Sequence, residues 1–560
     1  MFIIHKIILF IILLIILNNN KLFKQLNNQN ITTKYFKMKD IKDLSLEEKL
    51  GQLLIIGFKG PKLTDDIRNL IKEYKFGNFI LFARNIENIT QLENLTHKIH
   101  EEVISATGIM PFIAIDQEGG NIVRIMHKTT FYPGQMTLSA TKLSNSNEIG
   151  HMMGKHLIAL GLNMNFAPLL DINNNPKNPI IGIRSFSDNP ETVSKYGIEM
   201  IKGMHDEGVI ATAKHFPGHG DVENDSHLGL PVLPFDKKRL YDMELKPFKE
   251  AINNGVDNIM TAHIIFKEVD KENPATLSED ILKGLLRKEL NYKGLITSDC
   301  MEMKAISEGI TTPVGVYKGL KAGVDLVCIC HTKQRQIDSI EKLKQAINDN
   351  LISIEEIDDK IKRILHYKKE VYLSMKNKFF KNEKNLDIFK DDNQAKILQN
   401  IVDSSLTFVN GKKLEIKGKT LVYWCKQYAS NAAEDILDNI TIDDLIKQEI
   451  PSVNLLQYIP KKYNKELIDK AKEYETVIFL SFNAFQIQSQ AKMINDINQL
   501  CKNFFVISMR NPYDYLKLDE NINFYTLYES TPNSLRTIVK FLKGEIEANG
   551  KLPITLNHNL

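Results

Sequence analysis

Residues 213–231, AKHFPGHGDVENDSHLGLP, concentrate side chains that can carry or transfer protons. The stretch holds three histidines, two aspartates and one glutamate, interspersed with Gly and Pro. Histidine donates and accepts protons near neutral pH, so it can serve as a general acid or base. We therefore expect a functional site here rather than a purely structural loop.

Asp225 and His227 form the most suggestive pair in this stretch. Residues two apart project to the same side of an extended chain. A carboxylate that accepts from one imidazole nitrogen fixes the tautomer and raises the basicity of the other nitrogen. From spacing alone, a surface Asx turn beside an uninvolved histidine is the competing interpretation.

A metal site is another interpretation of the same loop, because His215 and His219 are four residues apart. Pro217, Gly218 and Gly220 disfavour a helix between them, so the helical spacing of zinc-binding histidines is not expected. We predict that the protein uses no metal and no organic cofactor.

The elements that would position these groups begin near Ser45 and Glu48, which match a helix capping box. Eight short apolar runs of strand type follow, with helical patterns between them. These runs are 52–58, 77–83, 111–116, 162–168, 208–215, 256–263, 294–299 and 323–330. Such alternation indicates a parallel sheet buried on both faces. We predict a (β/α)₈ barrel over residues 41–373, and an open doubly wound sheet is the alternative.

Polar residues gather where these apolar runs end. The residues are Asp116, Lys214, His215, His263 and Asp299. In a barrel the carboxyl ends of the strands form one rim, where catalytic groups collect. For Asp299 alone, capping of a following helix is an equally good interpretation. Several strands that end in such residues make a site at the rim the better prediction.

A second α/β domain is predicted over residues 405–560, after a charged, irregular linker at 374–404. Its strand-type runs are 419–425, 476–482, 504–510 and 522–529. We expect a smaller three-layer sandwich without a catalytic cluster of its own.

The N-terminus and the composition limit the function classes. Residues 1–17 are nearly all apolar with Lys6 as an early positive charge, which makes residues 1–20 typical of a signal peptide or membrane anchor, and 21–40 form a polar linker. We expect an exported protein, secreted or tethered to the membrane at the cell surface. The 72 basic and 69 acidic residues give a net charge of only +3, so no nucleic-acid partner is indicated. The five cysteines form no C-x-x-C pair, and we predict no structural disulfide.

The loop resembles the K-H-F-P-G-H-G…D-S-H signature of family 3 glycoside hydrolases, and specifically their β-N-acetylglucosaminidase branch. The resemblance extends in order over about residues 41–560. Its other motifs are IDQEGGNIVR (115–124), NFAPLLDI (165–172), GIRSFSDNP (182–190), MTAHI (260–264), PATLS (274–278), SDCMEM (298–303), SMRNPYDY (508–515) and GKLPITL (550–556). One departure is Asn121, where the branch often has Arg.

This resemblance implies roles for individual residues. Asp299 matches the nucleophile that forms a covalent glycosyl–enzyme intermediate, His227 the general acid/base and Asp225 its orienting partner. The positions that bind the sugar correspond to Asp116, Arg124, Arg184, Lys214 and His215. A histidine in place of a second carboxylate departs from the common two-carboxylate pattern of retaining glycosidases.

We therefore expect a retaining exo-β-N-acetylglucosaminidase that acts on β-GlcNAc-containing glycans or muropeptides from peptidoglycan. The alternatives are a β-glucosidase or β-xylosidase of the same family, a GlcNAc phosphorylase, and a catalytically silent wall-binding protein. The sequence gives no basis for an oligomeric state.

Overall fold

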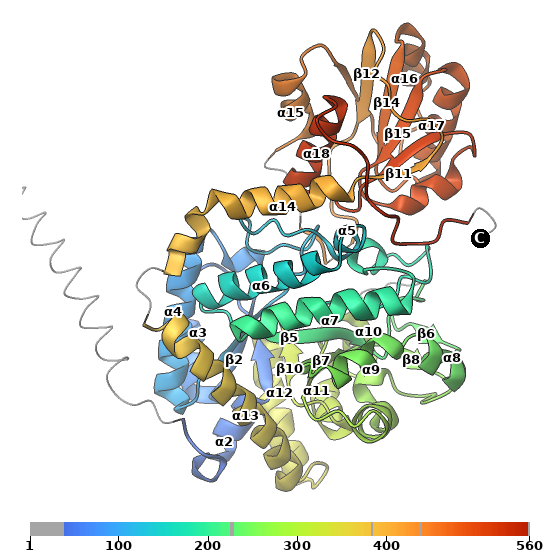
Figure 1. Cartoon of the computed structure of the whole chain (residues 1–560). Helices are drawn as coiled ribbons and strands as arrows, with labels where there is room; N and C mark the ends of the chain where they lie inside the picture. The colour runs from blue at the N-terminus through green and yellow to red at the C-terminus, as the bar shows by residue number, and fades with distance from the viewer. Residues whose placement is uncertain (1–37, 224–228, 382–384, 432, 436–439, 558–560) are drawn as a thin grey trace, which may run out of the picture.

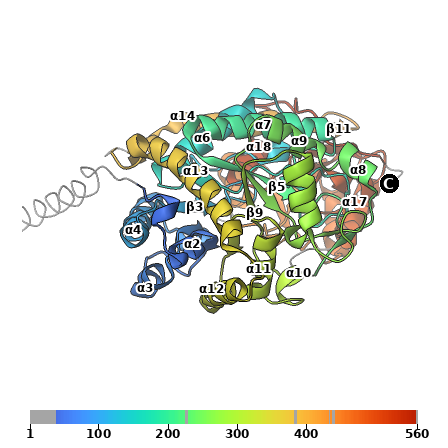
Figure 2. The ribbon, with the colours of Figure 1, turned by 90° about the horizontal axis from the view of Figure 1, so that it is seen from below.

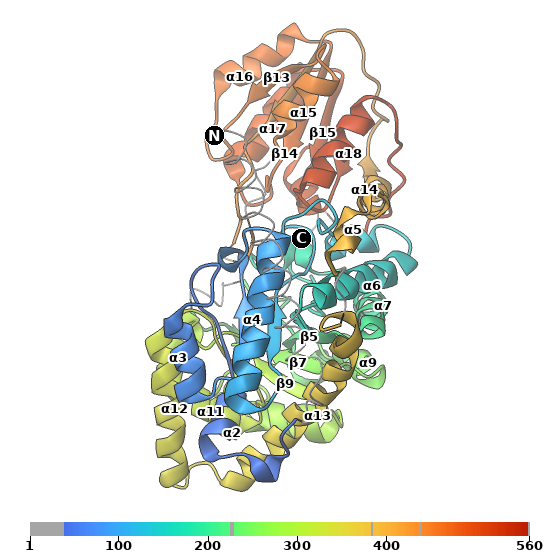
Figure 3. The same cartoon turned by 90° about the vertical axis from the view of Figure 1, so that its left-hand side faces the viewer.

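The computed structural model describes residues 38–223, 229–381, 385–431, 433–435 and 440–557. These residues form a barrel followed by a smaller domain. Figure 1 shows the smaller domain stacked on one end of the barrel, and Figure 3 shows the resulting elongated outline from the side. No helix among the described residues is long and apolar enough to cross a membrane, and the predicted N-terminal leader lies outside those residues.

Eight parallel strands form the wall of the barrel. They are β1 (Leu54–Ile56), β2 (Asn78–Leu81), β3 (Phe112–Ile115), β4 (Met164–Asn165), β5 (Ile210–Phe216), β7 (Asn258–Thr261), β9 (Leu295–Ser298) and β10 (Val327–Ile329). They pair in the order β10-β1-β2-β3-β4-β5-β7-β9, and a parallel bridge between Thr297 and Leu326 joins the two ends of the sheet. The predicted barrel is thus confirmed, and each predicted apolar run overlaps one strand.

Helices surround this wall, as Figure 2 shows along the barrel. The longer ones are α2 (Leu46–Gln52), α3 (Asp65–Tyr74), α4 (Ile89–Thr107), α6 (Ser144–Ala159), α7 (Pro190–Glu207), α9 (Lys246–Asn253), a helix at Asp280–Glu289, α11 (Thr312–Ala322), α12 (Lys333–Asn348) and α13 (Ile354–Lys378). Shorter elements in the loops are α5 (Gln135–Ser139), α8 (Lys237–Asp242), α10 (Lys304–Ser307) and the strand pair β6 (Val232–Leu233) and β8 (Ile265–Phe266). The predicted capping box is present at the start of α2, where Ser45 and Glu48 hydrogen-bond to each other's backbone N–H.

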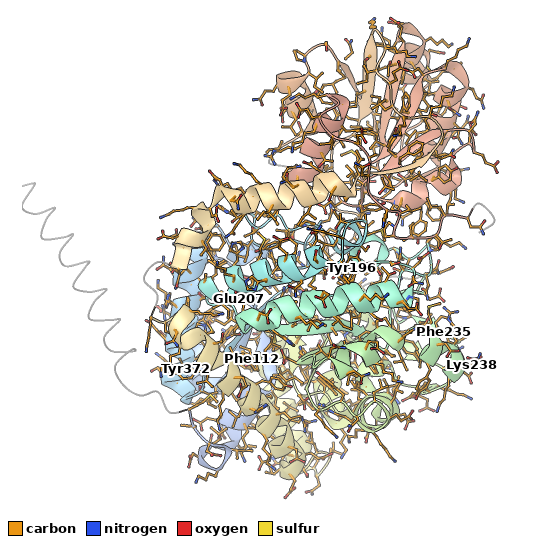
Figure 4. All side chains as sticks on the ribbon, viewed as in Figure 1. Phe112, Tyr196, Glu207, Phe235, Lys238 and Tyr372 are labelled. Atoms are coloured by element: carbon orange, nitrogen blue, oxygen red, sulfur yellow. The ribbon has the colours of Figure 1, made fainter. Side chains whose placement is uncertain are left out.

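The segment 374–404, predicted as an irregular linker, is largely helical. α13 continues to Lys378, and α14 spans Asp392–Ser405. Met375 and Phe379 are buried against the barrel, while Lys378 forms an ion pair of 2.5 Å with Glu207 at the end of α7, which Figure 4 labels. The prediction failed because only one face of this segment is apolar, and its many charged residues lie on the other face.

The second domain has a six-stranded sheet between two layers of helices. Its strands are β11 (Thr407–Asn410), β12 (Thr420–Trp424), β13 (Asn454–Gln457), β14 (Thr476–Ser481), β15 (Phe504–Ser508) and β16 (Asn523–Thr526), in the order β11-β16-β15-β14-β12-β13. The helices are α15 (Ile442–Glu449), α16 (Lys465–Lys470), α17 (Gln488–Leu500) and α18 (Pro532–Leu542). Alternate residues of one strand enter opposite cores: Phe479 packs with α17, whereas Ile478 packs with α15 and α18. The predicted α/β sandwich is therefore confirmed.

A buried carboxylate ties the two domains together. Glu529, just after β16, accepts hydrogen bonds at 2.6 Å from the Gly134 N–H and from the Thr137 hydroxyl of the barrel. Glu529 is 1% exposed, and this burial raises the pKa of its carboxyl group. Tyr513 and Tyr528 of the second domain pack nearby against apolar side chains of the barrel. These contacts hold the second domain on the rim of the barrel.

Candidate active site

A cavity of about 530 Å³ opens at the carboxyl ends of the barrel strands. It is lined by the six described residues that the sequence singled out as site residues: Asp116, Arg124, Arg184, Lys214, His215 and Asp299. The other two, Asp225 and His227, lie outside the described residues. His263, also expected at the rim, is buried beside the cavity, where its ring hydrogen-bonds to Thr276 and to the carbonyl of Cys300.

An ion-pair network forms one wall of the cavity. Both oxygens of Glu118 accept hydrogen bonds from Arg184, at 2.8 and 3.0 Å, and Lys214 lies 2.6 Å from Glu118 Oε1. Lys214 Nζ also donates to Asp116 Oδ1 at 3.0 Å. Three of these side chains have exposed fractions of 8% or less, so the network is almost dry.

The charges in this network stabilise one another. Burial alone would raise the pKa of Glu118, but Arg184 and Lys214 outweigh it and hold that pKa well below its usual range. Burial alone would lower the pKa of Lys214, and Glu118 and Asp116 raise it instead. Glu118 and Lys214 are therefore both charged at neutral pH. Their fixed N–H groups suit the hydroxyl oxygens of a polar ligand as charge-assisted donors.

A second buried network centres on Asp171, which follows β4. Its carboxylate accepts from His215 Nδ1 at 2.7 Å and from the backbone N–H groups of His215 and His219, at 3.0 and 2.7 Å. Burial alone would raise the pKa of Asp171, but His215 lowers it. This pairing sets the tautomer of His215, because Nδ1 must carry the proton in order to donate the hydrogen bond to Asp171. The described structure thus contains an Asp–His pair, distinct from the one expected at Asp225 and His227.

His219 does not supply a charged group to the cavity. Burial and the neighbouring His215 lower its pKa to about 4, so its ring is neutral at physiological pH. The helix that would bring His215 and His219 together as metal ligands is not present, because β5 ends at Phe216 and a loop follows. The two rings instead meet edge to face, with centroids 5.6 Å apart.

Asp299 directly follows β9 and is half-buried at the cavity wall. Its Oδ1 accepts from the N–H of Cys300 at 2.7 Å. The capping interpretation is wrong, because the next helix, α10, begins at Lys304 and Met303 precedes it as the N-cap. Asp299 is therefore a strand-end carboxylate that faces the same cavity as the buried cationic groups.

The second domain completes the wall of the cavity. Ala433, Glu434 and Asp435 belong to the segment between β12 and α15, and all three line the cavity. Arg124 Nη1 donates to Asp435 Oδ2 at 2.5 Å and to the carbonyl of Ala433 at 2.9 Å. Burial raises the pKa of Asp435, and Arg124 partly offsets that effect. Arg124, expected to bind substrate, thus also links the two domains.

Asn121 has a related role in the interface. Its side-chain amide donates to the Ser530 carbonyl and accepts from the Ser530 N–H, and its backbone carbonyl accepts from the N–H of Asp435 at 3.1 Å. The departure at Asn121 noted in the sequence therefore lies at the domain boundary, next to the segment that carries Asp435.

Three of these residues were not singled out from the sequence: Glu118, Asp171 and Asp435. Glu118 lies in the motif at 115–124 and Asp171 in the motif at 165–172, shortly after β3 and β4. Their positions beyond the ends of these strands could have identified them as rim residues. Asp435 lies in NAAEDILDN, which has no pattern typical of a site, and only the packing of the domains reveals its position.

We predict that Asp435→Asn lowers kcat/KM on a glycoside substrate by roughly tenfold, because Arg124 loses a charge-assisted partner. The change keeps the shape of the side chain, so the fold should persist. Steady-state kinetics would measure the effect. The matched control is Asp469→Asn in the same domain, where a surface carboxylate pairs with Lys472. Equal effects of the two changes would contradict a role for Asp435 in the cavity.

Comparisons with known proteins identify the family of the chain. Residues 45–367 match the family model described as "Glycosyl hydrolase family 3 N terminal domain". A β-hexosaminidase A of Pseudoalteromonas piscicida is 34% identical over 365 residues, which are 58% of this chain and 61% of that protein. A β-hexosaminidase of Haemophilus influenzae is 36% identical over 53% of this chain and 84% of its own length.

A solved structure agrees over most of the chain. A family 3 β-N-acetylglucosaminidase from a Paenibacillus species superposes with a TM-score of 0.84 and 34% identity, over 92% of this chain and all of that one. The match therefore includes the second domain as well as the barrel. The protein belongs to glycosyl hydrolase family 3, and its relatives include proteins named β-hexosaminidases.

Proposed function

We propose that the protein is a retaining exo-β-N-acetylglucosaminidase that removes terminal GlcNAc from peptidoglycan fragments. The observation that carries the proposal is the placement of Asp299, a strand-end carboxylate in a cavity lined by Lys214 and Arg184. Retaining glycosidases need such a carboxylate as nucleophile, together with a separate proton donor. The resemblance to the Paenibacillus β-N-acetylglucosaminidase supports the choice of sugar.

In this mechanism Asp299 attacks the anomeric carbon and the glycosidic bond breaks. His227, oriented by Asp225, protonates the leaving oxygen. It then removes a proton from the water that attacks the anomeric carbon, which breaks the bond to Asp299 and releases the sugar. Lys214, Asp116 and Arg124 would hold the sugar hydroxyl groups, because these side chains line the cavity and are kept in place by their ion pairs. A fixed sugar ring presents its anomeric carbon to Asp299 without a large entropy loss during the reaction.

The proposed acid/base makes a prediction about leaving groups. His227→Ala should lower the rate for substrates with poor leaving groups by roughly 10²- to 10⁴-fold, and much less for activated aryl substrates, because only the former need protonation. A series of aryl β-N-acetylglucosaminides with graded leaving-group pKa would measure this dependence. The same loss for every leaving group would instead make His227 a binding residue.

The substrate proposal is tested by chromophore release from an aryl β-N-acetylglucosaminide and an aryl β-glucoside, measured side by side. Faster release from the N-acetyl sugar is expected. Faster release from the plain glucoside would contradict the peptidoglycan assignment, and release from neither would favour a silent wall-binding protein. Formation of GlcNAc-1-phosphate in phosphate buffer would show phosphorolysis instead of hydrolysis.

We further propose that the protein is exported and kept at or outside the cell membrane. The apolar stretch at the N-terminus, with the early charge of Lys6, supports this proposal. Fractionation of cells that express the full chain would test it, and recovery of the protein in the cytosolic fraction alone would contradict it.

A further inference from the structure

A cluster of three different metal-binding side chains lies in the cavity wall beside Asp299. Cys300 comes from the loop after β9, and so does Glu302, while His331 comes from the loop after β10. One ligand atom from each of them, the thiol sulfur, a carboxylate oxygen and an imidazole nitrogen, lies within 4.8 Å of the other two. All three residues line the same cavity as Asp299. The mechanism proposed above uses none of them.

Two of these side chains are held in place by contacts within the protein. The Glu302 carboxylate accepts from the N–H of His331 at 2.6 Å and from the N–H of Thr332 at 3.1 Å, and its side chain is 5% exposed. The His331 ring packs against Phe82, with centroids 5.3 Å apart. These contacts join the two loops, so the ligand atoms converge without a large rearrangement.

The chemical nature of the three donors selects a class of ion. Thiolate and imidazole are ligands that Zn²⁺ favours, and a carboxylate completes a common type of zinc site. Hard ions such as Mg²⁺ and Ca²⁺ require mainly oxygen ligands, which this cluster does not offer. A thiolate and a carboxylate together carry two negative charges, which match a divalent cation. Arg335 Nη1 lies 3.8 Å from a carboxylate oxygen of Glu302 and forms an ion pair with it, so it offsets part of the negative charge that the cluster presents to a cation.

We propose that Cys300, Glu302 and His331 bind one Zn²⁺ ion and that the bound ion inhibits the enzyme. On binding, the Cys300 thiol loses its proton to solvent and the sulfur forms a bond to the metal, with no change of oxidation state. Three protein ligands leave a further coordination position for water or for a substrate group. His331 is exposed, which gives the ion a route from solvent.

The inhibitory effect rests on the proposed function, because it acts through Asp299. Cys300 follows Asp299 directly and donates its N–H to the Asp299 carboxylate at 2.7 Å. A dication next to this carboxylate would weaken it as a nucleophile. It would also repel the positive charge that develops on the sugar in an oxocarbenium-like transition state. Zn²⁺ should therefore lower kcat more than it changes KM.

Metal binding is tested first and without any assay of activity. The purified full-length protein is titrated with Zn²⁺ in competition with a chromogenic chelator, and one ion per chain is expected. Cys300→Ser, Glu302→Gln and His331→Asn should each weaken binding by at least about tenfold. Cys501→Ser is the matched control, because it removes a half-buried thiol of the second domain. No binding by the wild type, or equal binding by all variants, would overturn the proposal.

Cobalt gives a test that does not depend on the folding of any variant. Co²⁺ bound by the unmodified protein should produce the charge-transfer absorption of a cobalt–thiolate bond, and added Zn²⁺ should remove it. A Co²⁺ complex without this band would exclude Cys300 as a ligand and overturn the site.

Inhibition is measured separately, as the ratio of rates with and without Zn²⁺ within each variant. Zn²⁺ should inhibit the wild type and Cys501→Ser, a chelator should restore the rate, and the three ligand variants should lose this sensitivity. Stoichiometric binding without loss of activity would overturn the inhibitory role. If the protein has no glycosidase activity at all, the proposed function fails, whereas the binding and cobalt tests still decide whether the metal site exists.

Discussion

Asp299→Ala is expected to lower kcat by at least about 10⁴-fold, because the change removes the only group proposed to bond to the anomeric carbon. Loss of a nucleophile leaves only the contribution of binding and of the remaining polar groups. KM should change much less than kcat, because Lys214, Asp116 and Arg124 still hold the sugar. Single-turnover kinetics with an aryl β-N-acetylglucosaminide would show whether the chemical step is lost.

The matched control for this prediction is Asp338→Ala, which removes an exposed carboxylate from helix α12 of the same barrel. Both variants should unfold at nearly the wild-type temperature, since Asp299 is only half-buried. Activity of Asp299→Ala close to that of Asp338→Ala would refute the mechanism, and the assignment of the nucleophile with it.

Glu118→Gln is expected to have the largest effect on stability, about 3 kcal/mol of unfolding free energy. The neutral amide keeps the shape of the side chain but leaves Arg184 and Lys214 without their shared carboxylate in a nearly dry site. Removal of the shared partner from a buried ion-pair network takes away both carboxylate hydrogen bonds that Arg184 makes to Glu118, while Lys214 keeps its bond to Asp116. Denaturant unfolding at pH 7 would measure the loss, and kcat/KM should fall with it because Lys214 and Arg184 lose their positions.

The same variant has a predictable pH dependence. The pKa of Glu118 is lower in the folded protein than the ordinary value of 4.5. Its stabilising contribution is therefore complete above pH 4.5 and decreases as the pH falls from there toward the folded-state pKa. The difference in unfolding free energy between wild type and Glu118→Gln should therefore decrease in acid.

The control is Glu341→Gln, which changes an exposed carboxylate on α12. Its free energy of unfolding should differ little from that of the wild type. If the difference in unfolding free energy between wild type and Glu118→Gln increased in acid, the proposed ionisation of Glu118 would be contradicted.

The barrel could be predicted from the sequence because its strands are buried on both faces. A strand such as β3, FIAI, has no polar face, so it stands out as a continuous apolar run. In the second domain the same signal identified β12, β14, β15 and β16, but neither β11 nor β13, the two edge strands of the sheet. The residues of β13, NLLQ, lie at the edge of the sheet and are partly exposed, so its sequence has no distinctive pattern.

The site could be predicted only in part, for a physical reason. Asp116, Lys214 and Asp299 were identifiable because each one stands at or near the end of a buried strand, and such ends meet at one rim. Which residues form ion pairs with the cationic groups of the site could not be identified from positions at strand ends. Whether Lys214 pairs with Glu118, and Arg124 with Asp435, depends on how loops and domains pack in space, and no periodic pattern in the sequence encodes that packing.

The position of Asp435 has a consequence for how the enzyme matures during synthesis. The residues of the barrel leave the ribosome first, with Asp299 and Lys214 already in the chain. The stretch 433–435 follows well over a hundred residues after Asp299, and only then can Arg124 find its partner. Translation that stops after α13 would thus yield a barrel that carries its nucleophile but lacks one side of its pocket. Full activity would begin only once the second domain has folded and docked.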